Sequence, residues 1–248
     1  MVHAAGAGHP GGSLSVIDLF QSVMVGWGRF QMEDSARDWL VLAKGHATPA
    51  LYTTLAELGY ISEDELLTYR QFGSRLQGHP DRKRLPAVQV TTGHLGQGLS
   101  IASGIALGEK MAQSEANIYV ILGDGDLHEG QTWEAVMSSS HYDLDNLVAL
   151  LDLNQLTQHG PVEKVMSVDP LKDKWQSFGW ATREIDGHDY EEILAGLRWT
   201  SSQDHPCALL CHTVKGKGVS FMEGDPLWHS TTLSEETLNQ ALQELGES

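Results

Sequence analysis

The chain has 248 residues, of which 41% are hydrophobic and 20% charged, an ordinary balance for a globular protein of one large or two small domains. Its formal net charge of −17 argues against nucleic-acid binding, because an acidic surface repels phosphate backbones. Residues 1–20 lack the apolar core of a signal peptide, and no apolar run is long enough to span a membrane, so we expect a cytoplasmic protein.

Taken in chain order, the apolar periodicity predicts helices that alternate with short apolar strands. The expected helices lie at residues 13–25, 48–58, 63–71, 97–111, 131–140, 190–199 and 234–245, and the expected strands at 117–124, 147–152, 180–185 and 207–212. Ser62, with Glu65 three residues later, has the signature of a capping box. This alternation favours an α/β fold with a parallel sheet, in which ligands bind at the carboxyl ends of the strands.

The chain shows no internal repeat, low-complexity segment or long Pro/Gly-rich linker, so we expect residues 1–248 to form a single domain. Met1 is followed closely by a Gly-His-Pro-Gly-Gly turn that a helix would normally precede, and we therefore expect the N-terminal helix to be truncated or the start to be mis-set. Cys207 and Cys211 lie in an apolar run and are predicted to be buried free thiols, because two cysteines make no disulfide framework.

Polar residues follow two of the predicted strands. Asp124 stands between Gly123 and Gly125 at the end of one strand, and Asn154 and Leu156 follow the next. Adjacent parallel strands bring their carboxyl ends together, so a carboxylate, an amide oxygen and a backbone carbonyl can reach one cation. Mg²⁺ takes such oxygen ligands together with phosphate oxygens. The pattern predicts a metal-bridged phosphate site; the alternative is two unrelated turns, where Asp, Asn and Gly are common.

Histidines recur in glycine-framed turns. Of the twelve histidines, those directly after a glycine are His9, His46, His79, His94 and His188. Imidazole suits both proton transfer near neutral pH and hydrogen bonding to hydroxyls and phosphate. We expect His141, His188, His205 and His212 to be structural or solvated, whereas His9, His46 and His79 are candidates for function. No histidine or cysteine spacing is typical of a zinc site.

Several short motifs, taken together and in order, resemble the diphosphate-binding half of the transketolase family. The matching segments are residues 8–13, 44–47 with 51–52, 77–80, 91–98, 123–130 with Asn154, and 228–229. They extend from residue 8 to residue 229, nearly the whole chain. The resemblance implies a thiamine-diphosphate-binding fold of the PP type, with a parallel sheet flanked by helices.

The resemblance also implies a cofactor site. Asp124, Asn154 and the Leu156 carbonyl would hold Mg²⁺, or Ca²⁺ or Mn²⁺ in its place, and Leu95 would lie near the aminopyrimidine of thiamine diphosphate. The residues expected to contact the cofactor are His46, Gly93, Leu95, Gly96, Gly123, Asp124, Gly125 and Asn154.

Four further residues are expected to be catalytic by the same resemblance. His9, His79 and His229 would face the substrate channel, bind sugar hydroxyls and shuttle protons. Glu129 would support a carboxylate network that links the two active sites of a dimer. The positions that depart from the family pattern are His94, Gln158, His159 and Ser230, and a polar Gln158 could alter how the bent cofactor is supported.

The implied reaction is the transfer of a two-carbon ketol unit from a ketose, expected to be phosphorylated, to an aldose. In the family, a glutamate on a second domain binds the aminopyrimidine, and the residues after His229 suffice for one helix only. We therefore expect a partner chain with the pyrimidine-binding and C-terminal domains, in a heterotetramer. The alternatives are the alpha chain of a 2-oxo acid dehydrogenase, a degenerate scaffold or regulatory chain, and a stand-alone sugar-binding module.

Overall fold

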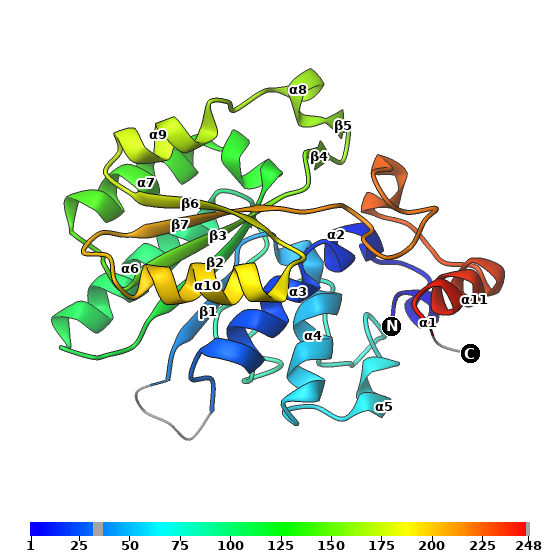
Figure 1. The fold of residues 1–248 in the computed structure, drawn as a ribbon. Helices are drawn as coiled ribbons and strands as arrows, with labels where there is room; N and C mark the ends of the chain where they lie inside the picture. Colours follow the sequence, from blue (N-terminus) through cyan, green and yellow to red (C-terminus); the bar gives the residue numbers. More distant parts are fainter. Residues whose placement is uncertain (32–36, 247–248) are drawn as a thin grey trace.

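The computed structural model describes residues 1–31 and 37–246. A parallel five-stranded sheet runs through its centre (Figure 1). In spatial order its strands are β1 (Trp39–Leu42), β2 (Ile118–Gly123), β3 (Leu147–Leu153), β7 (Cys207–His212) and β6 (Ala181–Asp186). The register pairs Gly123 with Asp152 and Asp152 with Cys211, so β2, β3 and β7 end side by side. The predicted α/β class with a parallel sheet is confirmed.

Helices cover both faces of the sheet, which explains the nearly continuous apolar strands. One face packs on α6 (Gln97–Met111), α7 (Gly130–His141) and α9 (Leu171–Ser177). The other packs on α3 (Ile17–Gln21), the π-helical turn η1 (Ser22–Trp27), α4 (Thr48–Glu57) and α10 (Tyr190–Thr200). Along β2, Val120 and Leu122 belong to the first layer, and Tyr119 and Ile121 to the second.

The remaining elements lie outside the two helical layers. They are α1 (Val2–Ala5), α2 (Pro10–Leu14), α5 (Glu63–Leu66), α8 (Val162–Val165), α11 (Glu235–Glu244), the hairpin strands β4 (Leu156–Thr157) and β5 (Gly160–Pro161), and the 3₁₀ turns η2 (Gly45–Ala47), η3 (Asp124–His128) and η4 (Pro226–His229). Helix α11 packs through Ala241 on Val219 and Met222.

Two predicted helices were wrong in extent. The helix expected at residues 13–25 is broken into α2, α3 and η1, and Ser15 at the first break donates a hydrogen bond of 2.8 Å to Asp152 Oδ2. The helix expected at residues 63–71 ends at Leu66. Ser62 caps its start by accepting from Glu65 N, but the Glu65 carboxylate bonds to Arg75, so only half of the predicted capping box forms. Strand β1 and helix α9 were missed, because four and seven residues are too short for a periodicity signal.

Cys207 and Cys211 are free and buried, as predicted. Within residues 1–31 and 37–246, no helix combines the length and the apolar character needed to cross a membrane.

Candidate active site

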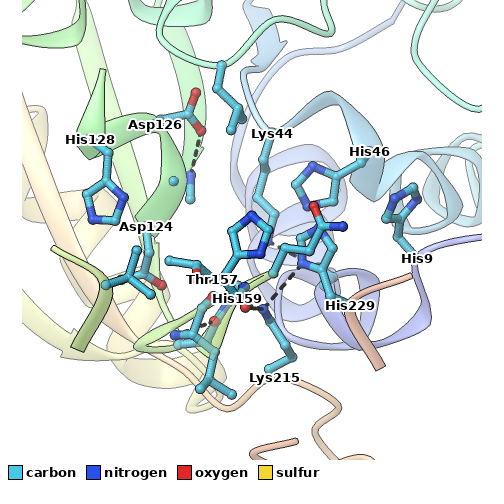
Figure 2. A pocket seen from close by; sticks show the side chains of 18 of the residues that line it. His9, Lys44, His46, Asp124, Asp126, His128, Thr157, His159, Lys215 and His229 are labelled. Carbon is cyan, nitrogen blue, oxygen red and sulfur yellow. Dashed lines mark hydrogen bonds between the residues drawn. The ribbon is translucent and has the colours of Figure 1, made fainter. Parts of the chain in front are cut away.

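A cavity of about 480 Å³ opens at the carboxyl edge of the sheet, beside the ends of β2, β3 and β7 (Figure 2). Every residue predicted for the site lines this cavity except Gly96. Gly96 lies just behind the wall, where its N–H donates to Asp126 Oδ1 at 3.0 Å. The structure therefore brings together the strand-end polar residues and the histidine turns.

Asp124 and Asn154 approach each other at the ends of neighbouring strands. Asp124 is 3% exposed, and its Oδ2 accepts a hydrogen bond of 3.0 Å from Gln155 N. Asn154 Oδ1 accepts from Leu156 N at 3.2 Å, and its Nδ2 donates to Asp152 Oδ2 at 3.3 Å. Burial, followed by the charge of Asp152, raises the pKa of Asp124 to about 7. A cation beside Asp124 would relieve this cost, since it would stabilise the ionised carboxylate.

The donor set at this point fits a hard cation. It offers a carboxylate, an amide oxygen and a carbonyl, and among the residues that the structure describes there is no cluster of three His, Cys, Asp or Glu suited to a metal. Such a sparse oxygen set suits Mg²⁺, which completes its shell with phosphate oxygens and water. The Leu156 carbonyl already accepts from Lys215 Nζ at 2.8 Å, so a metal there would share this oxygen or displace the lysine.

Two lysines bring positive charge into an otherwise acidic chain. Lys44 precedes η2, is 3% exposed and forms an ion pair with the fully buried Asp152. Burial alone would raise the pKa of Asp152, but the charge of Lys44, with hydrogen bonds from Lys44, Thr213 and Ser15, holds it below its ordinary value. Lys215 is 2% exposed, and burial together with the charge of Lys44 lowers its pKa to about 8. The two ammonium groups suit a ligand that carries several negative charges.

Three histidines from distant segments, His9, His46 and His229, lie side by side on one wall of the cavity (Figure 2). The ring centroids of His9 and His46 are 5.0 Å apart, those of His46 and His229 are 4.9 Å apart, and those of His9 and His229 are 5.5 Å apart. Burial is the first cause that lowers the pKa of His9 to about 4, of His229 to about 3, and of His46 well below 6.5. These imidazoles are therefore neutral at pH 7, so each can donate one hydrogen bond and accept another.

Close backbone contacts explain the glycines of the histidine turns. A Cβ on Gly45 would lie 2.9 Å from Gly93 Cα and 3.2 Å from His79 Cδ2, so two turns pack directly against each other. Gly96 has φ +80°, and a Cβ there would lie 2.5 Å from Glu129 Cβ. The bare backbone of Gly96 therefore packs directly against the Glu129 side chain, which lies exposed at the rim of the cavity.

The hairpin of β4 and β5 forms another wall. Its tip, Gln158 and His159, lines the cavity and is exposed, and the charge of His159 is among those that lower the pKa of His229. His94 instead lines a neighbouring groove with His79, outside the main cavity. Of the residues that depart from the expected pattern, Gln158 and His159 are therefore the ones placed to affect a ligand.

Four buried polar residues of the site were missed by sequence reasoning. They are Lys44, Asp126, Asp152 and Lys215. Asp126 accepts from Gly123 N at 2.9 Å and from Gly96 N, and thereby ties the loop before α6 to the end of β2. Burial raises the pKa of Asp126 to about 6 against these hydrogen bonds. A signal existed for the lysines, because each adjoins a glycine just after a strand of a strongly acidic chain.

Two orphaned nitrogens mark where a ligand is expected. His9 Nδ1 and His128 Nε2 are buried and have no hydrogen-bond partner within the described residues, and both side chains line the cavity. Because buried polar atoms are normally satisfied, these atoms suit a ligand that supplies oxygen atoms or protons inside the cavity.

Comparisons with known proteins point to one family. The family described as "Transketolase, thiamine diphosphate binding domain" matches residues 1–248. The chain is 40% identical over 254 residues to one of the subunits of the apulose-4-phosphate transketolase of Phocaeicola vulgatus, covering 100% of this chain and 89% of that protein. It is 40% identical over 244 residues to one of the subunits of the 6-deoxy-6-sulfo-D-fructose transketolase of Clostridium sp. (strain MSTE9), covering 97% and 89%.

Longer transketolases match over part of their length. Human transketolase is 38% identical over 246 residues, which is 98% of this chain but 39% of that protein. The crystal structure of Campylobacter jejuni transketolase superposes with a TM-score of 0.90 at 31% identity, over 100% of this chain and 40% of that one. The structure of Leishmania mexicana transketolase superposes with a TM-score of 0.92 at 28% identity, over 100% of this chain and 39% of that one. The chain thus spans about 40% of the solved transketolases.

Proposed function

Since the chain belongs to the transketolase family and matches its thiamine-diphosphate-binding domain from end to end, we propose that it is the diphosphate-binding subunit of a two-chain transketolase. The enzyme transfers a two-carbon ketol unit from a ketose to an aldose. The observation that carries the proposal is the single cavity in which Asp124, Asn154 and the Leu156 carbonyl face three neutral histidines. We take residues 1–248 as one domain, in keeping with the five-stranded sheet on which the main helices of the described residues pack.

The strand-end residues bind the diphosphate end of the cofactor. Asp124, Asn154 and the Leu156 carbonyl hold Mg²⁺, and Lys44 and Lys215 offset the negative charge of the diphosphate. The remaining cofactor contacts come from His46 and from the glycine turns, namely Gly93, Leu95, Gly96, Gly123 and Gly125. When bound, thiamine diphosphate supplies the nucleophilic carbon and the electron sink of the reaction.

The histidines act on the sugar. His9, His79 and His229 are neutral at pH 7, so they bind hydroxyl groups as donor or acceptor and move protons to and from them. Glu129 lies at the exposed rim, where it can hydrogen-bond to a group outside this chain and so support the link between two active sites.

A companion chain completes the enzyme. Two of the relatives are themselves subunits, and the chain covers 89% of each, so the division of the enzyme between chains is already present in them. We propose that the companion carries the pyrimidine-binding domain and that two copies of each chain form a heterotetramer. A phosphorylated or sulfonated sugar is the proposed donor, in line with the substrates in the names of these relatives.

The experiment that tests this proposal is calorimetry with thiamine diphosphate and Mg²⁺, with and without the companion, paired with an assay of two-carbon transfer. We expect Mg²⁺-dependent binding and activity only when both chains are present. Asp124→Ala should weaken cofactor binding by roughly 100-fold, since it removes the only carboxylate of the cation site. Asp173→Ala, on the exposed side of α9, should bind the cofactor like the wild type.

Activity of this chain alone would contradict the two-chain assignment. Full activity of Asp124→Ala would contradict the metal site, and a complex that forms but never binds the cofactor would point to a scaffold role.

A further inference from the structure

His188 uses both nitrogens of its ring. Its Nδ1 lies 2.7 Å from Asp18 Oδ2 on helix α3, and its Nε2 accepts a hydrogen bond of 2.9 Å from Val214 N, just beyond β7. The His188 side chain is 11% exposed, so these contacts are shielded from most of the solvent. Three segments far apart in the sequence therefore meet at this one ring.

The contacts of His188 fix which ring nitrogen carries the proton. A backbone N–H can only donate, so Nε2 is the unprotonated nitrogen of a neutral imidazole. The proton is then on Nδ1, which donates to the Asp18 carboxylate. Carboxylates that hold a histidine in one tautomer recur in active sites, because the other ring nitrogen then has a defined role.

The turn that carries His188 is rigid. The His188 N–H donates to Asp186 Oδ1 at 2.8 Å, and the next residue, Asp189, caps helix α10. Gly187 packs against the end of β7, where an added Cβ would lie 2.4 Å from Thr213 Cγ2. The backbone thus presents the imidazole to β7 in one orientation.

Val214 directly precedes Lys215, whose side chain lines the cavity (Figure 2). The N–H groups of Thr213 and Gly216, on either side of this pair, donate to backbone carbonyls at 3.3 and 2.9 Å. The N–H of Val214 donates instead to a side chain, that of His188. Loss of the imidazole would therefore release the backbone at the residue before Lys215.

Lys215 joins two parts of the proposed site. Its Nζ donates to Leu156 O at 2.8 Å, the carbonyl proposed to bind the cation, and lies 3.4 Å from His229 Nδ1. Lys215 is 2% exposed, so its side chain has little room to compensate for a shift of its own backbone. A displacement at Val214 would thus move the ammonium group relative to both the hairpin and the histidines.

From this arrangement we propose that Asp18 and His188 are positioning residues for the diphosphate of the cofactor. Asp18 keeps His188 in the tautomer that accepts from Val214 N, and this bond sets the position from which Lys215 meets the diphosphate. Neither Asp18 nor His188 lines the cavity, so both act through Lys215. The identity of the ligand rests on the proposed function, whereas the placement of Lys215 does not.

The tautomer is tested on the chain alone by nitrogen NMR. We expect the wild type to show an unprotonated His188 Nε2 and a scalar coupling between this atom and Val214 N across the hydrogen bond. The coupling should weaken in Asp18→Ala, where no carboxylate selects the tautomer. A protonated Nε2 in the wild type would overturn the proposal.

The placement of Lys215 is followed on the same chain through the ring signals of His229. These signals should shift in His188→Ala, because Lys215 moves away from the His229 ring. They should stay in place in the control His212→Ala, which removes an exposed ring at the end of β7 whose partner is the exposed Glu184. Unchanged His229 signals in His188→Ala would also overturn the proposal.

The effect on the cofactor is measured by calorimetry of the two-chain complex with thiamine diphosphate and Mg²⁺. Because one hydrogen bond typically changes an equilibrium several-fold, we expect His188→Ala to raise Kd for thiamine diphosphate roughly 5- to 10-fold. His188→Gln should keep most of the affinity, since its side-chain oxygen can accept from Val214 N. Asp18→Ala should weaken binding when His188 is present but not in His188→Gln, because an amide has no tautomer to select.

A double-mutant cycle with Lys215→Met separates positioning from general damage to the fold. If His188 acts through Lys215, His188→Ala should have little further effect on Kd once the lysine is replaced. Additive effects of the two replacements would overturn the proposal while leaving the proposed function intact. A wild-type complex that binds no thiamine diphosphate would contradict the proposed function, and the His229 signals of the chain alone would then decide whether His188 places Lys215.

Discussion

Single residues at the cavity are held in states that water would not favour. Asp152 is ionised with no exposure to solvent, and the depressed pKa values of His9, His46 and His229 keep these rings neutral although they are surrounded by polar groups. Each state has a partner that explains it: Lys44 for the carboxylate, and burial among other cationic groups for the imidazoles. The same states make the stability of the chain depend on pH.

The histidines should destabilise the chain as the solution is acidified. Their ordinary pKa is 6.5, whereas His9 and His229 have values of about 4 and about 3 in the folded chain. Below pH 6.5 the unfolded chain binds protons that the folded chain does not, so the free energy of unfolding falls as pH falls. Asp124 and Asp126, with raised pKa values, act in the opposite direction.

The double variant His9→Gln/His229→Gln lacks both rings, so comparing it with the wild type isolates their contribution to the pH dependence of the unfolding free energy. Between pH 7 and 4.5 we expect the wild type to lose about 2 kcal/mol more unfolding free energy than this variant, a figure that allows for solvent screening of half-exposed rings. Urea unfolding at several pH values measures it. If the unfolding free energies of the two proteins fell in parallel with pH, folding would not lower the pKa of the two rings, contrary to the prediction.

At the scale of elements, the apolar pattern of the sequence predicts helices and strands but not the side-chain interactions between distant segments. Strands β2, β3 and β7 were predictable because each is a largely apolar run, and Asp124 with Asn154 was predictable because parallel strands end together. The role of Lys44 was not, because its partner Asp152 lies 108 residues away at the end of another strand. The break at Ser15 has the same cause, since its partner is also Asp152.

Helix α6 has two glycines that nothing in the described chain requires. A Cβ on Gly104 or Gly108 would meet no atom within 4 Å, yet a glycine inside a helix costs about 0.5–1 kcal/mol relative to alanine. The two lie one turn apart on a face that continues to Met111, which is 78% exposed. Glycines in this position allow another helix to approach closely, so we expect a second copy of the chain to pack here.

Replacing these glycines separates folding from assembly. Gly104→Ala/Gly108→Ala should raise the free energy of unfolding of the isolated chain by about 1–2 kcal/mol and weaken self-association, measured by urea unfolding and analytical ultracentrifugation. Gly196→Ala on α10 is the contrast, because its Cβ would lie 3.3 Å from Leu209 Cδ1 and should give no stabilisation. Undiminished self-association in the double variant would place the contact between copies elsewhere.

For the whole molecule, long-range electrostatics are set by the excess of acidic residues, 33 against 16 basic ones. Like charges repel over a Debye length of about 30 Å at 0.01 M salt but about 8 Å at 0.15 M, so added salt should relieve this repulsion in the folded chain. Local ion pairs oppose the effect only weakly. Exposed pairs such as Lys110–Asp145 contribute little, and the buried Lys44–Asp152 pair is hardly screened.

We therefore expect the free energy of unfolding to rise by about 1 kcal/mol between 0.01 and 0.15 M NaCl, measured from urea unfolding at pH 7. KCl at equal ionic strength should act alike, because screening does not depend on the identity of the ion. A fall in stability over this range would mean that favourable pairs outweigh the net repulsion. Residues 70–84, which hold five of the 16 lysines and arginines, would then stabilise the fold through long-range attraction to the acidic remainder.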